Sequence, residues 1–557
     1  MGTRSPGRSL SKSAPPASSA AASVLNQGWV NAAIDFVDAN LEAGRADKIA
    51  IQVAGTPQSL TYAEVASLVN RAGNGLLGLG LQVEQRAVIL LPDGPDFVAA
   101  FFGAIKAGIV PVPANTLLQP GDYRFLLEDS RAQALIVAES LLDRVAPALD
   151  GLRHLRHVTV SVDGSGDSGE VARGRRSTWS RHGMAEILDS ADTDLDPEPM
   201  SSDDPCFWLY SSGTTGFPKG AVHLQHDMGV CAEGYARGVL GLTAEDTTYS
   251  VAKLFFAYGL GNALYFPFAV GATTVLDSGR PTPEAVFRNL VDYDPTVFYS
   301  VPTNFGALLD VPRESAPDAL RSLRCCVSAG EALPVAIYDD WLARYGVEIL
   351  DSIGSTEVLH MFIANRPGAV RKGSSGKPVP GYDARLVDDR GDDVEVGEVG
   401  DLLIRGDSTC AYYWNRHEQT KATLLGDWIR TGDKYRIDED GYYWYQGRED
   451  DMLKVGGIWV SPFEVESAVV RHPDVLEAAV VGMADAQGLV KPKAFVVLNA
   501  AARESHSGTL VQLGEAIQAF VKEGIAPFKY PRWIEFVDEL PKTATGKIQR
   551  YRLRTSP

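Results

Sequence analysis

The sequence predicts an α/β fold: a large N-terminal domain of mixed, mostly parallel sheets with helices, a small β-barrel-like subdomain, and a small α+β C-terminal domain. Two features predict this fold. Short apolar strands alternate with helical stretches from about residue 50 onward. After residue 397 this alternation gives way to β-forming residues and turns. At 557 residues the chain is long enough for several cores.

The first third of the sequence carries clear helix and strand signals. Thr61-Tyr-Ala-Glu64 has the pattern of a capping box and predicts a helix that continues through Leu79. A strand, a helix of small residues and a second strand are then expected at residues 87–91, 97–108 and 109–112. This β-α-β order implies parallel sheet. Residues 163–204 are rich in Gly, Ser and Asp and are expected to form a loop.

The alternation resumes after residue 204 and changes toward the C-terminus. Strands are predicted at residues 206–210, 273–276, 297–301, 324–328 and 347–350, and β-rich segments at 397–405 and 442–446. From residue 452 an α+β unit is expected, with helices at 464–471 and 510–523 and strands at 476–483 and 494–498. The expected division is a disordered tail at 1–24, a large domain at 25–449 and a small domain at 450–557.

The composition excludes several classes of partner. The net charge of −19 disfavours nucleic acid and anionic membranes, and no apolar run reaches the roughly 18 residues of a membrane span. The Ala/Ser/Pro-rich residues 1–24 lack the apolar stretch of a secretion signal. The five cysteines show no metal or disulfide spacing, and adjacent Cys325 and Cys326 are predicted core residues. A cytoplasmic protein is expected.

The rest of the chain is organised around Tyr210-Ser-Ser-Gly-Thr-Thr-Gly-Phe-Pro-Lys-Gly220, which follows a predicted buried strand. Glycines and hydroxyls leaving a strand present N–H and O–H donors in an arc that suits phosphate oxygens, and Lys219 adds a positive charge. The spacing is not that of a Walker A loop, because Phe-Pro separates Gly216 from Lys219. The extended residues 221–224 predict that the loop joins two strands. A surface turn is the alternative for this composition.

In length and order this loop resembles the signature loop of the acyl-adenylate-forming enzymes, the superfamily of acyl- and aryl-CoA ligases, luciferases and peptide-synthetase adenylation domains. The resemblance implies that the loop holds the phosphates of ATP. It assigns to the nucleotide Ser211, Ser212, Gly213, Thr214, Thr215, Gly216 and Lys219. Of these, Thr215 and Lys219 would also be catalytic.

Two further loops follow predicted strands and are expected at the carboxyl end of a sheet, where open α/β folds bind ligands. They are Ser328-Ala-Gly-Glu331 and Asp351-Ser-Ile-Gly-Ser-Thr-Glu357. The resemblance assigns to the adenine Gly330, Glu331, Asp351, Ser352, Ile353, Gly354 and Ser355, and to the phosphates and Mg²⁺ Thr356 and Glu357. Mg²⁺ prefers one or two carboxylates with phosphate oxygens, so Glu357 is the predicted metal ligand; a solvated loop glutamate is the alternative. Many members have an aromatic residue where this chain has Ile353, which leaves the adenine contact there open.

Three motifs near the C-terminus extend the resemblance. Thr431-Gly-Asp433 and Gly447-Arg448 match ribose-binding residues, which assigns Asp433 and Arg448 to the nucleotide. Gln446-Gly-Arg-Glu-Asp-Asp-Met-Leu-Lys-Val-Gly-Gly457 matches the hinge and CoA-loop motif. It makes Asp450 the hinge of a mobile C-terminal domain, Lys454 a catalytic residue, and Gly456 and Gly457 the CoA-binding glycines. Lys547, in Pro541-Lys-Thr-Ala-Thr-Gly-Lys547, matches the lysine that bridges carboxylate and α-phosphate, and Lys542 is a solvated neighbour. Alone, Thr-Gly-Asp and the charged hinge motif could each be a surface turn.

The acid substrate is expected between residues 253–261 and 353–360. Aromatic side chains, a small Ala257 and glycines suit a flat ring better than an alkyl chain. Phe-Phe-Ala-Tyr-Gly259 and Gly-Ser-Thr-Glu-Val-Leu-His360 resemble strings of the benzoate-CoA ligase branch. That resemblance directs to the ring Ala257, Tyr258, Gly259, Ala329, Gly330, Ile353 and His360. Phe255 and Phe256 could equally be core residues.

The resemblance therefore implies an AMP-forming acid-thiol ligase that uses ATP, CoA and Mg²⁺ to convert benzoate, or a substituted benzoate, into its CoA thioester. Three alternatives remain: a hydroxybenzoate ligase with His360 bound to the ring hydroxyl, an enzyme that loads a carrier protein, and a nucleotide-binding regulatory protein without turnover. The simultaneous presence of Lys219, Glu357, Asp433, Arg448 and Lys547 argues against the last. The sequence leaves open the ring substituents, the resting domain orientation and the oligomeric state, for which a homodimer is one alternative.

Overall fold

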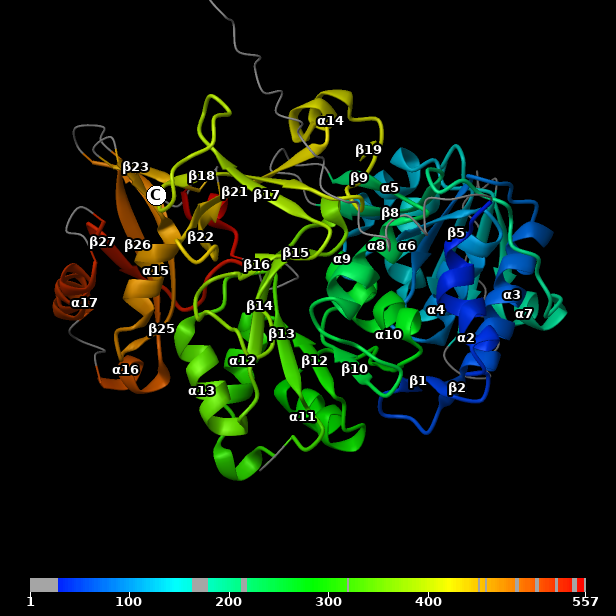
Figure 1. Ribbon diagram of the computed structural model, residues 1–557, viewed down its shortest axis with the longest axis horizontal. Helices are drawn as coiled ribbons and strands as arrows, with labels where there is room; N and C mark the ends of the chain where they lie inside the picture. The colour runs from blue at the N-terminus through cyan, green and yellow to red at the C-terminus, as the bar shows by residue number, and fades with distance from the viewer. Residues whose placement is uncertain are drawn as a thin grey trace, which may run out of the picture.

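The computed structural model describes residues 29–162, 179–211, 218–317, 320–448, 451–455, 458–485, 490–505, 510–525, 529–542 and 548–554, without the side chains of residues 454, 458, 459 and 551. Figure 1 shows two large sheets with helices around and between them, and the C-terminal residues, coloured orange to red, grouped at one end of the molecule. In the described part of the chain, no helix combines the length and the apolar character needed to cross a membrane. The predicted α/β class is confirmed.

The first large sheet has five strands, all parallel, in the order β4-β3-β5-β6-β7. Its strands are β3 (Arg86–Leu90), β4 (Val110–Pro113), β5 (Ala134–Ala138), β6 (His157–Ser161) and β7 (Ser180–Gly183). Its helices are α3 (Tyr62–Gly78), α4 (Pro95–Lys106), α5 (Pro120–Asp129), α6 (Leu142–Leu149) and α7 (Met184–Ser190). The capping box predicted at Thr61 and Glu64 starts α3. Because alternate residues of a strand face opposite sides, β3 sends Ile89 into one core and Val88 into another.

The second large sheet has nine strands in the order β16-β15-β14-β13-β12-β10-β11-β1-β2. Its strands are β1 (Ile49–Val53), β2 (Ser59–Thr61), β10 (Thr247–Ser250), β11 (Thr273–Leu276), β12 (Val297–Ser300), β13 (Cys325–Ser328), β14 (Ile349–Gly354), β15 (Met361–Ala364) and β16 (Lys377–Pro378). The six strands from β14 to β1 are parallel, and the others are antiparallel edges. Cys325 and Cys326 are buried as predicted, and they enter different cores on the two faces of β13.

A layer of helices and apolar side chains between the two large sheets forms one shared core. It includes Ile89 of the first sheet and Tyr299 of the second, with Phe101 of α4 and Phe268 of α10 (Phe266–Val270) between them. Helices α11 (Pro283–Asp292), α12 (Pro302–Leu309) and α13 (Val335–Tyr345) cover the opposite face of the nine-stranded sheet. Parallel strands covered on both faces are apolar along their whole length, which explains why they could be predicted.

Smaller sheets complete the structure. The hairpin β8 (Pro205–Ser211) and β9 (Lys219–Leu224) joins β19 (Tyr412–Tyr413) in a three-stranded antiparallel sheet. The predicted β subdomain is a five-stranded antiparallel sheet of β17 (Asp383–Val387), β18 (Val399–Arg405), β20 (Leu424–Leu425), β21 (Trp428–Ile437) and β22 (Tyr443–Arg448). Short helices between these elements include α8 (Asp227–Cys231), α9 (Ala257–Leu260), the 3₁₀ turn η6 (Thr356–Val358) and α14 (His417–Thr423).

The C-terminal residues have cores of their own, centred on side chains such as Val465, Val480 and Ile517. Strands β25 (Val475–Ala484), β26 (Val490–Leu498) and β27 (Trp533–Phe536) pair in that order. With them lie β23 (Leu453–Val455), β24 (Ile458–Val460), α15 (Pro462–Val470), α16 (Ala500–Ser505), α17 (Leu510–Gly524) and α18 (Arg550–Arg554). The predicted α+β unit is confirmed. The predicted domain boundary at 449/450 and the tail at 1–24 lie outside the described residues.

One expectation about secondary structure is wrong. Residues 163–204 do not form a loop throughout, because β7 and α7 occupy residues 180–190. Gly, Ser and Asp dominate the composition of this stretch, but its few apolar side chains decide the structure locally. Met184 and Leu188, one helical turn apart, are both buried in the core beside α3.

Helices α3 and α4 approach each other closely at two glycines. A Cβ added to Gly103 would lie 2.7 Å from the carbonyl oxygen of Val69 and 2.8 Å from the nitrogen of Gly73. A Cβ added to Gly73 would lie 2.8 Å from the carbonyl oxygen of Gly103. The backbone of each helix therefore occupies the space that a side chain would need.

We predict that Gly103→Ala lowers the free energy of unfolding by about 1–3 kcal/mol, because overpacking against backbone outweighs the gain of about 1 kcal/mol in helix propensity. Urea unfolding followed by circular dichroism measures this. The control is Gly78→Ala at the end of α3, where a new Cβ meets nothing within 4 Å. An equal change in the free energy of unfolding of the two variants would contradict the close contact between α3 and α4.

Candidate active site

The loop that resembles the signature loop joins two antiparallel strands, as predicted. Strands β8 and β9 pair with Tyr210 opposite Gly220 and Ser211 opposite Lys219. The loop residues Ser212, Gly213, Thr214, Thr215 and Gly216 lie outside the described residues. The described ends of the hairpin place the Ser211 hydroxyl and the Lys219 ammonium on one face of the sheet, because residues that pair directly share a face.

Glu357 meets this face of the sheet. Its Oε1 accepts a hydrogen bond from Ser211 Oγ at 3.1 Å and another from the Tyr413 hydroxyl at 2.8 Å. Lys219 Nζ lies 4.2 Å from the centre of the Tyr413 ring. Burial and the neighbouring Glu357 raise the pKa of Tyr413, so the hydroxyl stays a donor. The structure thus brings together Ser211, Lys219 and Glu357, which are up to 146 positions apart.

The surroundings of Glu357 fit a magnesium ion held by few protein ligands. Only one of the two carboxylate oxygens is engaged by side chains in the described part of the chain. Among the described residues there is no cluster of three or more His, Cys, Asp or Glu that could form a cage around a metal. Mg²⁺ is typically bound by one or two carboxylates, phosphate oxygens and water, which matches this single carboxylate beside the hairpin predicted to bind phosphate.

The residues assigned to adenine lie at the carboxyl ends of two neighbouring parallel strands. Ala329, Gly330 and Glu331 follow β13, and Gly330 has a φ of +90°, which favours glycine. Asp351, Ser352, Ile353 and Gly354 end β14, and Ser355 caps η6 by accepting from the nitrogen of Val358 at 3.2 Å. Thr356 and Glu357 follow in η6. This is the predicted edge of the sheet.

Asp351 has an unusual environment for a carboxyl group. Burial raises the pKa of this carboxyl group well above its usual range. Its Oδ2 accepts from the nitrogen of Leu333 at 3.4 Å. Its Oδ1 has no hydrogen-bond partner among the described residues. A buried polar atom without a partner is costly, and a ligand at this edge of the sheet could supply one.

Asp433 and Arg448 face each other across β21 and β22. Arg448 Nη1 donates to Asp433 Oδ1 at 3.1 Å and to the carbonyl oxygen of Thr431 at 3.2 Å. The nitrogen of Asp433 donates to Thr431 Oγ1 at 3.1 Å. The two predicted ribose-binding residues therefore lie together, with the orientation of the carboxylate fixed by the strand pairing.

The residues assigned to the aromatic ring gather at the ends of β12 and β13. Ala257, Tyr258 and Gly259 belong to α9, and the Tyr258 hydroxyl donates to the carbonyl oxygens of Ser300 at 3.1 Å and Val327 at 3.3 Å. A Cβ on Gly259 would lie 2.1 Å from the carbonyl oxygen of Lys253, so only glycine fits there. Ala329 is buried, and Ile353 is partly buried.

His360 lies in the same region and is only 2% exposed. Its ring is surrounded by the rings of Tyr235, Tyr258, Tyr265 and Phe266. Its Nε2 lies 3.1 Å from Oδ1 of Asn262, an acceptor, so Nε2 carries the proton. Nδ1 is then an acceptor, and it has no hydrogen-bond partner among the described residues. Burial lowers the pKa of His360 to about 3, so the ring is neutral.

Five assigned residues of the C-terminal motifs remain predictions. Asp450, Gly456, Gly457 and Lys547 lie outside the described residues, and of Lys454 only the backbone, in β23, is described. Lys542, expected to be a solvated neighbour of Lys547, forms an ion pair with Glu477 at 2.7 Å.

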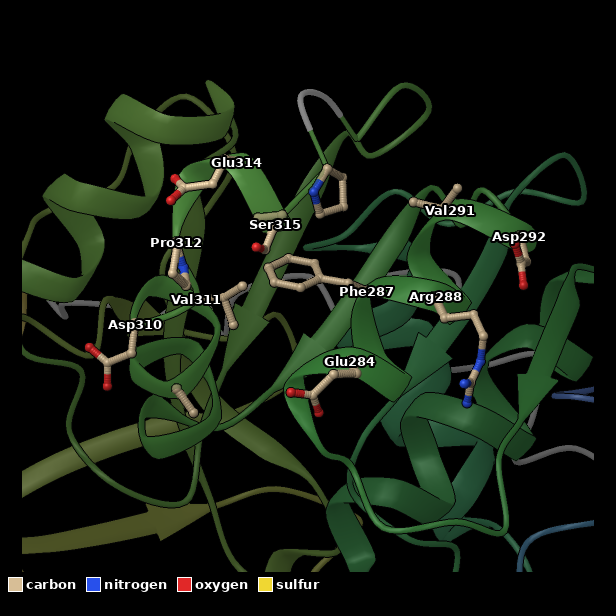
Figure 2. Close-up of a pocket in the computed structure, with 13 residues that line it drawn as sticks. Glu284, Phe287, Arg288, Val291, Asp292, Asp310, Val311, Pro312, Glu314 and Ser315 are labelled. Carbon is tan, nitrogen blue, oxygen red and sulfur yellow. The ribbon is translucent and has the colours of Figure 1, made fainter.

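A depression of about 780 Å³ lies elsewhere, on the outer surface beside α11 and the end of α12. Figure 2 shows it between the helix that carries Phe287 and Arg288 and the segment 310–315. Four carboxylates and one guanidinium line it: Glu284, Asp292, Asp310, Glu314 and Arg288. None of its lining residues was predicted to bind nucleotide or acid, and none has a buried polar atom without a partner.

Four side chains near the predicted site residues were not predicted. Tyr413, His223 and Asn262 contact Glu357, Thr356 and His360, and Asp227 contacts His223. His223 lies four positions after Lys219 in an expected strand, and this even spacing placed it on the same face as Lys219. That spacing was the available signal; nothing in the sequence connects Tyr413 to Glu357.

Comparisons with known proteins agree with this geometry. The sequence matches the AMP-binding enzyme family over residues 38–414 and the AMP-binding enzyme C-terminal domain over residues 464–547. The chain therefore belongs to the AMP-binding enzymes, and the resemblance to the acyl-adenylate-forming superfamily is confirmed.

Within this family the similarity is to aryl-CoA ligases. The chain is 50% identical to the benzoate–CoA ligase of Thauera aromatica, over 94% of this chain and 96% of that protein. It is 45% identical to the 4-hydroxybenzoate–CoA/benzoate–CoA ligase of Rhodopseudomonas palustris, over 94% of each. The crystal structure of a benzoate CoA ligase from Burkholderia xenovorans LB400 superposes with a TM-score of 0.83 at 44% identity, covering 94% of this chain and all of that one. The chain thus lies in the benzoate-CoA ligase branch.

The environment of His360 predicts a pH-dependent stability. Its pKa in the folded protein, about 3, lies below the unfolded value near 6.5, so below about pH 6.5 only the unfolded state takes up the proton. The contribution of His360 to the free energy of unfolding therefore falls as the pH falls, by about 2 kcal/mol between about pH 7 and pH 5.

We predict that the free energy of unfolding of His360→Gln, measured in urea, falls by about 2 kcal/mol less than that of the wild type over this pH interval. The control is His417→Gln, which replaces an exposed histidine of α14 and should keep the pH dependence of the wild type. An equal change of this pH dependence in both variants would contradict its assignment to His360.

Proposed function

We propose that this protein is an aryl-CoA ligase that activates benzoate, or a substituted benzoate, with ATP and transfers the acyl group to CoA. One observation carries the proposal: the phosphate-binding hairpin and the carboxyl end of the nine-stranded sheet meet at Glu357, beside the residues assigned to the ring. The similarity to benzoate–CoA ligases supports the choice of acid.

In the first step, an oxygen of the substrate carboxylate attacks the α-phosphorus of ATP. The bond to the bridging oxygen of the β-phosphate breaks, and that oxygen leaves with the electron pair as part of pyrophosphate. Both reactants are anionic, so nearby cations and N–H donors are required to lower their repulsion and stabilise the transition state. Lys219 supplies one cation from β9, and Arg448 with Asp433 orients the ribose.

Mg²⁺ fits beside Glu357, where it would neutralise charge on the phosphates. The protein's part is to hold the carboxylate still. Ser211 and Tyr413 do so by donating to the same oxygen, and no side chain in the described part of the chain donates to the other one. We propose that the buried Asp351 carboxyl meets the adenine through Oδ1, which has no hydrogen-bond partner among the described residues.

In the second step, the thiolate sulfur of CoA attacks the acyl carbon of the aryl adenylate. The new C–S bond forms, the C–O bond to AMP breaks, and AMP leaves with the electron pair; the thiol proton goes to solvent. We propose that residues 450–557 form a small mobile domain that turns about Asp450 between the steps, so that Lys547 serves the first and Lys454, Gly456 and Gly457 serve the second. The separate core of this region supports it.

A hydroxybenzoate is the second candidate substrate, and His360 favours it. The neutral ring has an acceptor, Nδ1, without a partner among the described residues, and Asn262 Nδ2 beside it also lacks one. A ring hydroxyl could donate to Nδ1. A hydroxyl would satisfy an otherwise costly buried acceptor, whereas an unsubstituted ring would leave it unsatisfied.

The protein is proposed to work in the cytoplasm. All five cysteines are free and buried, which suits a reducing compartment. The homodimer remains one alternative for the oligomeric state.

A panel of benzoate and its hydroxy, amino and chloro derivatives, assayed with and without CoA, tests the function. We expect pyrophosphate exchange with benzoate in the absence of CoA, and AMP release with thioester formation only when CoA is added. Exchange without CoA-dependent AMP release would indicate transfer to a carrier protein. No exchange with any acid would overturn the proposal.

Lys547→Ala tests the assignment of the two steps. A cation about 4 Å from the developing charge is worth about 4 kcal/mol at an effective dielectric near 20, so adenylate formation should fall roughly a hundredfold or more. Thioester formation from supplied benzoyl-AMP should be spared. Lys542→Ala, which removes the lysine paired with Glu477, is the matched control and should leave both steps close to wild type. Equal loss of both steps in Lys547→Ala would mean that the lysine supports the structure.

A further inference from the structure

A buried histidine and aspartate lie directly behind the turn that carries Glu357. His223 Nδ1 lies 2.7 Å from Oδ2 of Asp227, and both side chains are completely buried. His223 Nε2 lies 2.8 Å from the carbonyl oxygen of Thr356, the residue before Glu357. The reaction as described above uses neither side chain.

Strand geometry explains why His223 reaches this turn. Lys219, Ala221 and His223 alternate along β9, so their side chains share one face of the three-stranded sheet. Ser211 and Tyr413, the two residues that donate to Glu357, pair with Lys219 and Ala221 and therefore lie on that face too. One surface thus holds η6 at two points: the side chain of Glu357 and the carbonyl of Thr356.

The protonation of the pair follows from its neighbours. A carbonyl oxygen only accepts, so Nε2 must carry a proton and donate it to Thr356. Nδ1 and Oδ2 lie within hydrogen-bond distance of each other and so share a proton. The nitrogen of Leu224 also donates to Oδ2, at 3.1 Å. The ring of Phe207 stacks on His223 with centroids 5.2 Å apart, which fixes the ring plane.

The other carboxylate oxygen of Asp227, Oδ1, has a second histidine beside it. It lies 3.3 Å from Nε2 of His226. His226 donates to two carbonyl oxygens, of Ser202 at 2.8 Å and of Asp407 at 2.9 Å. Oδ1 accepts no hydrogen bond among the described residues, so the carboxylate is fixed through Oδ2, by His223 and the nitrogen of Leu224. This pairing in turn limits the movement of the Nε2–H of His223.

The rest of the turn is anchored through the backbone. Ser408 Oγ donates to the carbonyl oxygen of Val358 at 2.8 Å, and the nitrogen of Cys410 donates to the carbonyl oxygen of Glu357 at 2.7 Å. The Thr356 carbonyl also accepts from the nitrogen of Leu359 at 3.2 Å, within the turn, and the bond from His223 ties this carbonyl to the sheet that carries Lys219. A carboxylate that binds a metal must be held to about half an ångström, and supporting hydrogen bonds do this.

We propose that Asp227 and His223 form a positioning pair that holds the Thr356 carbonyl and so fixes Glu357 for the magnesium–ATP complex. The inference rests on the proposed function, because it assumes that Glu357 serves a phosphate-bound metal. His223 and Asp227 touch no reactant; they act through the backbone of η6. Removing the Nε2 donor takes away the side-chain hydrogen bond to the Thr356 carbonyl and leaves Glu357 less firmly oriented toward the metal.

The test uses three variants in the full-length chain. His223→Asn keeps a donor to Asp227 but cannot reach Thr356. His223→Gln places an amide N–H nearer to Thr356 and serves as the conservative rescue. Asp227→Asn leaves the Nε2–H of His223 in place and removes its anionic partner. The control is Asp38→Asn, which breaks the largely buried ion pair of Asp38 with Lys106, at 2.7 Å, away from the site.

The first measurement is ATP binding by calorimetry with no acid present, so that no reaction occurs. With Mg²⁺, we expect His223→Asn to bind ATP about tenfold more weakly than the wild type, and His223→Gln to recover at least about threefold of that loss. In EDTA both should bind ATP within about twofold of the wild type, because the pair acts through the metal ligand. Asp227→Asn should lie between the wild type and His223→Asn.

The second measurement separates the two half-reactions. Pyrophosphate exchange should fall about 10–100-fold in His223→Asn, and thioester formation from supplied benzoyl-AMP should stay within about threefold. Asp38→Asn should have a lower free energy of unfolding in urea, and both of its half-reactions should stay at the wild-type rate. Equal losses in both half-reactions, or equal weakening of ATP binding with Mg²⁺ and in EDTA, would overturn the proposal. If His223→Asn does not fold, the same two measurements on His223→Gln and Asp227→Asn test the proposal by the same criteria.

The proposed function can fail separately. If the wild type binds magnesium–ATP but exchanges pyrophosphate with no aromatic acid, the function is wrong, whereas the metal dependence of ATP binding still reports on the pair.

Discussion

The hydrogen bonds that Glu357 Oε1 accepts from Ser211 and Tyr413 connect the two halves of the candidate site. Glu357 belongs to the carboxyl end of the nine-stranded sheet, and the two donors belong to the three-stranded sheet. Together with the bond from His223 to the Thr356 carbonyl, this contact ties the hairpin predicted to bind phosphate to the edge predicted to bind adenine. Because both donors are neutral hydroxyls, they orient the carboxylate and leave its charge available to a cation.

The scaffold explains how such a contact can be held. Parallel strands of both large sheets are covered on two faces, so their carboxyl ends can move only if the packed layers move. Most residues assigned to adenine and to the aromatic ring directly follow β13 or end and follow β14, and the others lie in α9, after β10. A short loop after a buried strand inherits the position of that strand, which suits a site where two anionic reactants must meet in one orientation.

Local patterns predicted much of this arrangement. Continuous apolar runs predicted β3 and β11, and the capping box predicted the start of α3, because these signals are contained within a few residues. The short helix α7 was not predicted, because its few apolar residues lie in a polar, glycine-rich stretch. Of the site, the hairpin and the two strand-end loops could be predicted. Tyr413 could not, because its contact with Glu357 depends on the pairing of β19 with β9, nearly two hundred positions apart in sequence. His223 was within reach, since its spacing from Lys219 follows the period of a strand.

The placement of Cys325 and Cys326 in different cores has a consequence for how the molecule comes apart. A strand that contributes to both faces cannot leave one core and remain in the other. The shared core links the nine-stranded sheet to the five-stranded one, where Val88 and Ile89 make the same connection to a third core. Heat or denaturant should therefore melt these layers in one cooperative transition, with no intermediate that keeps one sheet and loses the other. The C-terminal residues, whose cores are their own, are free of that coupling.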